Sequence, residues 1–263
     1  RCTVVSSIRR VEGQAGHNAA EVTVVILARD EERTIAEVVA AAAPWCREVI
    51  VMDGRSRDAT REIARAAGAR VVQDPGLGKG AAIRASLTEC STEFIVFMDA
   101  DGSHDALDIP ALVQPLAAGV ASLSVGSRFA GGSDELSVSV GQLVRTIGNI
   151  MMNIAINKRW HVELTDTLNG FRAVRRTIAL NVELTEDTHT IEQEMVMKFL
   201  RHGHTVVNVP AHEYCRKFGE SHIRIWREWP KFVWCVVVNT AARDRGDRLV
   251  DPGKPAGTGA DTG

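Results

Sequence analysis

Short apolar runs alternate with amphipathic segments along much of the chain. Runs rich in β-branched residues predict buried strands, and apolar residues at helical spacing predict helices between them. The strands are expected at residues 22–27, 48–53, 69–73, 94–98, 121–126 and 205–209. The helices are expected at residues 33–43, 59–67, 79–88, 108–116 and 190–202. This alternation is typical of the α/β class, with a mostly parallel central sheet flanked by helices.

Two later segments have a different pattern. Apolar side chains recur at helical spacing over residues 143–156, with Arg145, Asn149 and Asn153 off the apolar face. We interpret this stripe as packing on the protein core, and contact with lipid is the alternative. Residues 225–238 predict a C-terminal amphipathic helix that combines tryptophans with arginines and a lysine. Such a helix suits a membrane interface, and packing on the core explains the pattern equally well.

Composition divides the chain into three parts. Residues 1–21 have no clear apolar period and predict a flexible N-terminal arm, and residues 244–263 lack apolar periodicity and predict a disordered tail. Residues 22–243 predict one domain.

The net charge of −2 gives no indication of nucleic-acid binding, and the five scattered cysteines favour a reduced, cytoplasmic environment. We find no apolar run in the sequence that is long enough to span a bilayer.

Two carboxylates follow the most apolar of the predicted strands. Asp99 and Asp101 come directly after residues 94–98, and Gly102 follows them. Ligands of open α/β sheets bind beyond the carboxyl ends of the strands, where these two side chains would lie. Carboxylates at this place suit a Mg²⁺ or Mn²⁺ ion that bridges a diphosphate. An ordinary Asp-Gly turn after a core strand explains the same residues without a ligand.

Cationic residues stand near other strand ends. Lys79 lies between Gly78 and Gly80 at the start of a predicted helix, where a phosphate can approach the backbone closely. This short segment alone also fits a flexible turn. Arg128 follows the predicted strand at residues 121–126, and its planar guanidinium suits the oxygens of a diphosphate.

In this order and spacing, the segments resemble the inverting family 2 glycosyltransferases of the GT-A fold. More narrowly, they resemble the polyprenyl-phosphate (dolichyl-phosphate) mannosyl- and glucosyltransferases. The matching motifs are Asp30-Glu31-Glu32, Asp53, Gly78-Lys79-Gly80, Asp99-Ala100-Asp101, Gly126-Ser127-Arg128, Asn169-Gly170-Phe171-Arg172 and Arg216-Lys217-Phe218-Gly219-Glu220-Ser221. The resemblance covers about residues 22–243. At three positions the chain departs from the family pattern: Gly54 replaces an Asp, Ser103 a Gln and His222 a Lys.

The resemblance implies a role for individual residues. The residues expected to bind the nucleotide sugar are Asp30, Glu31, Asp53, Lys79, Asp99 and Arg145. The residues expected to act in catalysis are Asp101, Arg128, Arg216, Asp166 and Glu194. Asp99 and Asp101 would hold Mg²⁺ or Mn²⁺, and the arginines would gather the phosphates. Asp166, Glu186, Asp187 and Glu194 are the candidates for a general base, should the acceptor be a hydroxyl.

The implied activity is inverting, metal-dependent transfer of a hexose from GDP-mannose or a UDP-sugar to an acceptor, with a polyprenyl phosphate as the leading candidate. A lipid phosphate is already anionic at neutral pH, so catalysis would rest on positioning and charge stabilisation. A small soluble or natural-product acceptor with a hydroxyl is the alternative, and an inactive nucleotide-sugar-binding subunit is a third interpretation. We expect a cytoplasmic protein with peripheral contact to the cytoplasmic face of the membrane, and no nucleic-acid partner.

Overall fold

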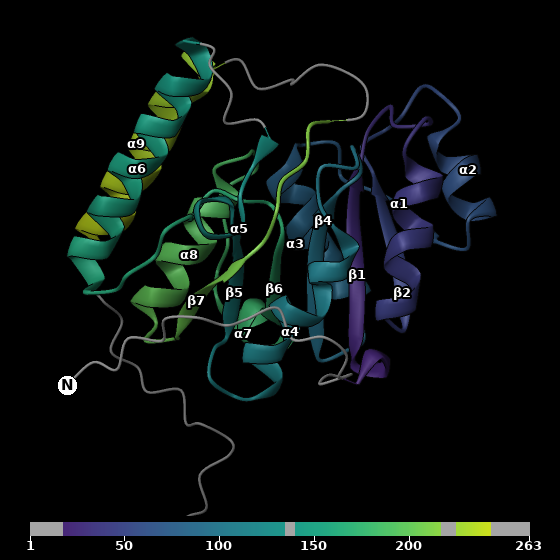
Figure 1. The fold of residues 1–263 in the computed structure, drawn as a ribbon, viewed down its shortest axis with the longest axis horizontal. Helices are drawn as coiled ribbons and strands as arrows, with labels where there is room; N and C mark the ends of the chain where they lie inside the picture. The colour runs from purple at the N-terminus through teal and green to yellow at the C-terminus, as the bar shows by residue number, and fades with distance from the viewer. Residues whose placement is uncertain (1–17, 135–139, 217–224, 243–263) are drawn as a thin grey trace, which may run out of the picture.

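A seven-stranded sheet forms the central layer of the computed structural model (Figure 1). The structure describes residues 18–134, 140–216 and 225–242, with the backbone alone for residues 140–145 and 225–229. The strands are β1 (Val22–Ala28), β2 (Glu48–Asp53), β3 (Arg70–Gln73), β4 (Phe94–Asp99), β5 (Leu123–Ser127), β6 (Arg172–Arg175) and β7 (Val206–Pro210). They lie in the order β3-β2-β1-β4-β6-β5-β7. All neighbours are parallel except β6, which runs antiparallel to β4 and β5, so the predicted α/β class is confirmed.

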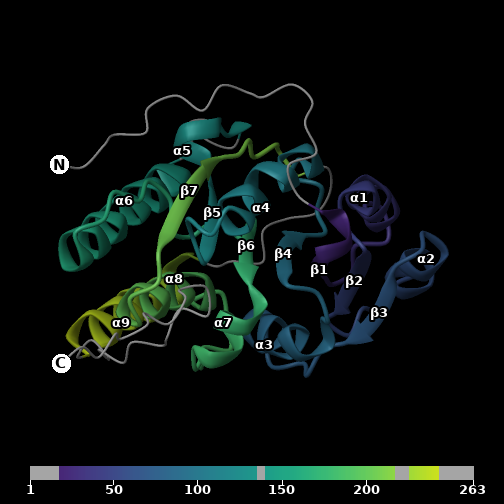
Figure 2. The same ribbon diagram turned by 90° about the horizontal axis from the view of Figure 1, so that it is seen from below.

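Helices cover both faces of the sheet (Figure 2). They are α1 (Ile35–Ala42), α2 (Thr60–Ala66), α3 (Lys79–Glu89), α4 (Ile109–Ala117), α5 (Arg128–Gly131), α6 (Val140–Trp160), α7 (Arg176–Asn181), α8 (Ile191–Arg201) and α9 (Ile225–Ala241). Because successive strand residues point to opposite faces, β1 contributes to two cores. Val24 and Ile26 pack in the core that α1 and α4 cover, and Val25 packs in the core that α3 and α8 cover.

Strand β6 was not predicted, because Thr165–Arg172 reads as an irregular polar stretch and an arginine begins and ends the strand. Arg172 is nevertheless fully buried. Its guanidinium donates hydrogen bonds to the backbone carbonyls of Asn169 (3.1 Å) and Glu192 (2.6 Å). A buried cation is tolerated where its donors are satisfied in this way, and local pattern cannot anticipate such partners.

Helix α6 packs on the core through Met152 and Ile156, but the predicted stripe from Ile147 to Ile154 lies on the opposite, exposed side, so the prediction of which side is buried is wrong. Met151 and Ile154 are 64% and 59% exposed, whereas Asn149 and Asn153 are buried. The reason lies in the loop that the helix covers. Asn153 Nδ2 donates a hydrogen bond to the carbonyl of Thr165 at 2.6 Å, and its Oδ1 accepts one from Thr167 Oγ1 at 2.7 Å. The asparagines of α6 therefore face inward, together with Met152 and Ile156.

Helix α9 confirms the predicted C-terminal helix and packs against α6 and α8. Cys235 and Asn239 face these neighbours and are buried, whereas Trp234 is 67% exposed. Within the described ranges, we see no helix with the length and apolar character needed to cross a bilayer. The predicted arm up to residue 17 and the predicted tail lie outside the described residues; Ala19–Glu21 forms a short 3-10 helix.

Candidate active site

Lys79 joins two carboxylates beyond the carboxyl end of β4. Its Nζ lies 2.8 Å from Asp99 Oδ1 and 2.7 Å from Glu192 Oε1. Lys79 is the first residue of α3, Asp99 is the last residue of β4, and Glu192 lies in the first turn of α8. The predicted residues Lys79 and Asp99 therefore lie together. Glu192 was not assigned to the site, although its place near the start of a predicted helix was apparent from the sequence.

The ionisation of this cluster is set by its neighbours. Burial raises the pKa of the Asp99 carboxyl, but the Lys79 ammonium outweighs it and holds the pKa well below its usual range. Burial likewise lowers the pKa of Lys79, and the charges of Asp99 and Glu192 more than reverse that effect. Asp99 and Lys79 are therefore both charged at neutral pH.

Gly170 lies directly against these three side chains. A Cβ added there would come within 2.9 Å of Lys79 Nζ and within 3.0 Å of Asp99 Oδ2 and Glu192 Oε1. Such contacts are closer than van der Waals packing allows, so the cluster can keep this geometry only beside a glycine.

Asp101 is held by its own loop and by a distant segment. Its Oδ1 accepts hydrogen bonds from the backbone N–H of Ser103 at 3.0 Å and from Ser103 Oγ at 2.6 Å. Its Oδ2 lies 3.2 Å from Nε of Arg216. The chain after β7 reaches this loop because the backbone N–H of Tyr214 donates to the carbonyl of Ser103 at 2.8 Å. The predicted pair of Asp101 and Arg216 therefore lies together; residues 217–221 of that motif lie outside the described residues.

The donor set of this loop fits a divalent ion that shares its ligands with a substrate. In the described part of the chain, no group of three or more His, Cys, Asp and Glu residues is arranged to hold a metal. Asp99 and Asp101 alone could supply two oxygen ligands. Mg²⁺ is commonly bound by one or two carboxylates with water and substrate phosphates, so these residues fit such an ion once a diphosphate is present.

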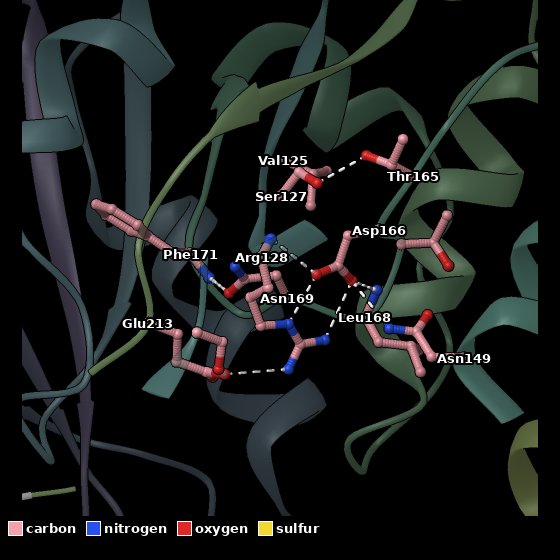
Figure 3. A network of polar contacts seen from close by, with 12 residues as sticks. Val125, Ser127, Arg128, Asn149, Thr165, Asp166, Leu168, Asn169, Phe171 and Glu213 are labelled. Atoms are coloured by element: carbon pink, nitrogen blue, oxygen red, sulfur yellow. Dashed lines mark hydrogen bonds and ion pairs between the residues drawn. The ribbon is translucent and has the colours of Figure 1, made fainter. Parts of the chain in front are cut away.

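Arg128 belongs to a polar network built on Asp166 (Figure 3). Nε and NH2 of Arg128 lie 2.7 Å and 3.1 Å from the two oxygens of Asp166, and NH1 lies 3.6 Å from Glu213. Asn149 of α6 donates a further hydrogen bond to Asp166 at 3.3 Å. The side chain of Asp166 is 0% exposed. Asp166 thus holds Arg128 in place, which differs from the open carboxylate expected of a general base.

The residues expected to contact the nucleoside lie at the ends of β1 and β2. The backbone N–H of Asp30 donates to Ser56 Oγ at 2.9 Å, and Asp30 Oδ1 accepts from the backbone N–H of Arg57 at 2.7 Å. Asp53 is fully buried and accepts from the backbone N–H of Ser56. The backbone N–H of Glu31 donates to Thr60 Oγ1 at 2.8 Å. The structure thus brings Asp30, Glu31 and Asp53 together, and their contact with a base stays a prediction.

One predicted residue, Glu194, lies away from the cluster of Lys79, Asp99 and Glu192. Glu194 is buried on α8, where its oxygens accept hydrogen bonds from the backbone of Thr185 at 3.0 Å and form an ion pair with Lys198 at 2.7 Å. These contacts give it a role in holding the loop before α8. Arg145 belongs to α6, and its side chain lies outside the described residues.

Comparison with known proteins places this arrangement in a family. The model of the family "Glycosyl transferase family 2" matches residues 23–182. Glycosyltransferase AglJ of Haloferax volcanii is 32% identical over 194 residues, which cover 73% of this chain and 62% of AglJ, so the chain spans less than two thirds of that relative. The dolichyl-phosphate hexose transferase of Haloferax volcanii is 27% identical, with 77% of this chain and 86% of that protein covered.

The fold is also shared with solved structures. Glucosyl-3-phosphoglycerate synthase of Mycobacterium tuberculosis, in complex with Mn²⁺, UDP-glucose and phosphoglyceric acid, superimposes with a TM-score of 0.70 at 23% identity. The match covers 91% of this chain and 88% of that chain. This likeness supports the GT-A fold. With a family model that covers more than half of its length, the chain belongs to glycosyl transferase family 2 and is a glycosyltransferase.

Proposed function

We propose that this glycosyltransferase moves a hexose from a nucleotide sugar to a polyprenyl phosphate, with inversion at the anomeric carbon. The observation that carries the proposal is the set of cations around the loop after β4. Lys79 forms an ion pair with Asp99, and Arg216 forms one with Asp101. Arg128 lies 3.6 Å from Glu213, and the backbone of Glu213 pairs with His104 of the loop after β4. Cations at this place suit the phosphates of a donor and of an anionic acceptor.

The carboxylates that could act as a general base are held by other ion pairs and hydrogen bonds, which favours an anionic acceptor. Asp166 is bound to Arg128, and Glu194 to Lys198 and the backbone of Thr185. Of the other candidates, Asp187 forms an ion pair with Arg84, and Glu186 accepts a hydrogen bond from Thr190 Oγ1. A hydroxyl acceptor needs a carboxylate free to take its proton, whereas a phosphate acceptor is already ionised.

The named relatives support the same acceptor and donor classes. One relative is a dolichyl-phosphate hexose transferase, and another is an undecaprenyl-phosphate 4-deoxy-4-formamido-L-arabinose transferase of Pseudomonas fluorescens, 25% identical over 214 residues. The structural neighbour binds UDP-glucose with Mn²⁺. On this basis we propose a nucleoside-diphosphate hexose as donor and a divalent cation as cofactor.

In the proposed reaction, a phosphate oxygen of the acceptor forms a bond to the anomeric carbon as the bond to the departing diphosphate breaks on the opposite face. Lys79 and Arg128 stabilise the charge that gathers on the diphosphate. Arg216 orients the acceptor phosphate beside Asp101. A divalent cation held by Asp99 and Asp101 would supply further charge neutralisation for the diphosphate.

The test is an intact-mass assay of the products. The full chain is incubated with Mn²⁺ or Mg²⁺, UDP- and GDP-hexoses, and a short polyprenyl phosphate. We expect a glycosyl-phosphoprenol, which is lost on chelation of the metal and in Asp101→Asn but kept in Glu62→Gln, a charge-neutralising control on α2. Near-normal turnover in Asp101→Asn would refute the metal assignment. Transfer to a hydroxyl acceptor without any lipid product would refute the polyprenyl-phosphate proposal.

A further inference from the structure

Helices α6 and α9 present apolar side chains to the outside of the molecule. Both lie at the same edge of the fold, beyond β7 (Figure 2). From α6, the exposed side chains are Ile147, Ile150, Met151 and Ile154. From α9, they are Val233, Trp234, Val237 and Val238. We call these eight side chains the outer apolar face.

Helix α6 leaves a stripe of apolar residues exposed and turns Met152, Ile156 and three asparagines inward. Its inward side carries Asn149, Asn153 and Asn157, spaced by one helical turn. Each is bound to the loop below: Asn149 to Asp166, Asn153 to the carbonyl of Thr165, and Asn157 to the carbonyl of Leu164. A stripe of exposed apolar residues on a helix whose inward side is already packed indicates that the outer side is built for an apolar environment.

The charged residues of the two helices also favour contact with an anionic surface. The last turn of α6 carries Lys158 and Arg159, and the sequence of the helix contains no acidic residue. Among the residues of α9 whose side chains the structure describes, Lys231 is the only charged one. The whole chain, in contrast, has a formal net charge of −2. Cations next to an apolar face complement a bilayer that contains anionic lipids.

A cavity of about 220 Å³ between α8 and α9 opens beside this face. Trp234 and Val238 belong both to its wall and to the outer apolar face. Its charged lining consists of Glu186, which accepts a hydrogen bond from Thr190, and of Glu194, Lys198 and Arg201 on α8. Nε of Arg201 is buried and has no hydrogen-bond partner among the described residues. The neighbouring Lys198 is already neutralised by Glu194 at 2.7 Å. Arg201 is therefore the group of this cavity that best suits an anionic headgroup.

We infer that the outer apolar face, together with the Arg201 cavity, docks the protein on the surface of an anionic phospholipid bilayer. Trp234 and Met151 enter the acyl boundary, and Arg201 binds a phosphate headgroup. The inference deepens the proposed function, because a polyprenyl acceptor resides in such a bilayer. Helix α6 would then touch lipid on one side and, through Asn149 and Asp166, the Arg128 network on the other.

The test is co-sedimentation of the full chain with vesicles. One vesicle contains phosphatidylcholine alone, and the other contains phosphatidylcholine with phosphatidylglycerol. We expect tighter binding to the anionic vesicle, reduced on the order of tenfold in the double variant Met151→Gln/Trp234→Gln. Arg201→Gln should lose roughly fivefold in binding to the anionic vesicle and keep its binding to the neutral one.

Matched controls separate docking from general surface effects. Leu107→Gln changes a side chain that is 68% exposed on another part of the surface, and Arg65→Gln removes an exposed cation of α2. Both should bind vesicles as the unmodified chain does. Circular dichroism melts confirm that each variant is folded. Equal binding of the double variant, or no preference for anionic vesicles, overturns the inference. A dimer seen by light scattering, broken by the double variant without any vesicle binding, overturns it in favour of a second copy.

Docking and transfer can fail independently. Transfer to a short, water-soluble polyprenyl phosphate measures the proposed function without a bilayer. A chain that binds anionic vesicles through the outer apolar face but transfers no hexose would retain the docking inference and refute the proposed function. A chain that transfers hexose but shows no preference for the anionic vesicle would refute the docking inference and retain the proposed function.

Discussion

Arg128 and Asp166 form a two-point ion pair, with Nε–Oδ2 at 2.7 Å and NH2–Oδ1 at 3.1 Å. They lie 38 residues apart, at the end of β5 and in the loop before β6. Because the side chain of Asp166 is 0% exposed, Arg128 is held at the sheet edge by a partner that water does not screen. The orientation of this cation therefore depends on one buried carboxylate.

Asp166→Asn should destabilise the protein by about 3 kcal/mol, because it removes the buried counter-charge of Arg128 and leaves only Glu213, 3.6 Å from NH1. Chemical denaturation at pH 7 measures this free energy of unfolding. Glu62→Gln, which removes an exposed carboxylate of α2, should change it by less than about 0.5 kcal/mol. A loss in Asp166→Asn no larger than in this control would show that the pair contributes no stability.

The pH dependence of that loss follows from the pKa of Asp166. Burial raises this pKa, but the Arg128 guanidinium brings it below its ordinary value. A depressed folded-state pKa means that the pair stabilises the protein fully above about pH 4, the unfolded value, and that this stabilisation is lost as the pH falls through the folded value. The difference between the unmodified chain and Asp166→Asn should thus shrink in acid. A difference that stays constant to pH 2 would contradict the charge pairing.

Gly170→Ala should impair donor binding while the fold is kept. The added methyl would meet the ends of Lys79, Asp99 and Glu192, which can move aside only by breaking their ion pairs. We expect a loss of about tenfold in kcat/KM and little change in melting temperature. Gly80→Ala is the contrast, because its Cβ would meet the rigid backbone carbonyl of Glu186 and should lower the melting temperature. A melting temperature lowered equally in both variants would indicate a structural role for Gly170.

Lys79→Met should weaken nucleotide-sugar binding and shift the pH dependence of activity. Without the ammonium, the pKa of Asp99 rises, so the acidic limb of the kcat/KM profile should move to higher pH. The KM of the donor should increase by about tenfold or more. Glu192→Gln keeps the pair of Lys79 and Asp99 and should show a smaller increase. An unshifted profile in Lys79→Met would show that Asp99 is not the group that limits activity in acid.

The inward and outward sides of α6 should respond differently to substitution. Asn153→Leu removes two hydrogen bonds and leaves the carbonyl of Thr165 and the hydroxyl of Thr167 unpaired, so the free energy of unfolding should fall by about 2–3 kcal/mol. Met151→Gln changes an exposed residue and should be neutral within about 0.5 kcal/mol. Denaturant titrations compare the two. A stability loss for Met151→Gln that matches Asn153→Leu would mean that the outer side is also packed.

Local pattern was sufficient for the elements that are apolar on the side they bury. Strand β4 is apolar from Phe94 to Met98 and is buried along its length, and α8 buries the stripe of Ile191, Met195 and Phe199 that its spacing predicts. In β4 and in this stripe of α8, burial follows from hydrophobicity, whereas the buried Glu192 and Glu194 of α8 are held by ion pairs. The α/β class and the positions of Asp99, Asp101 and Lys79 at helix and strand ends follow from the same pattern.

The tertiary structure decided where a polar residue is buried against a partner that is distant in the sequence. Arg172 is buried because backbone carbonyls accept its hydrogen bonds, and Asn149 and Asn153 face inward because the loop of residues 164–166 needs donors. Glu192 enters the site because α8 begins beside α3. The sequence by itself determined which residues prefer to leave water. The pairing of charges and hydrogen bonds, which overrides that preference at these positions, was decided by contacts that exist only in the folded chain.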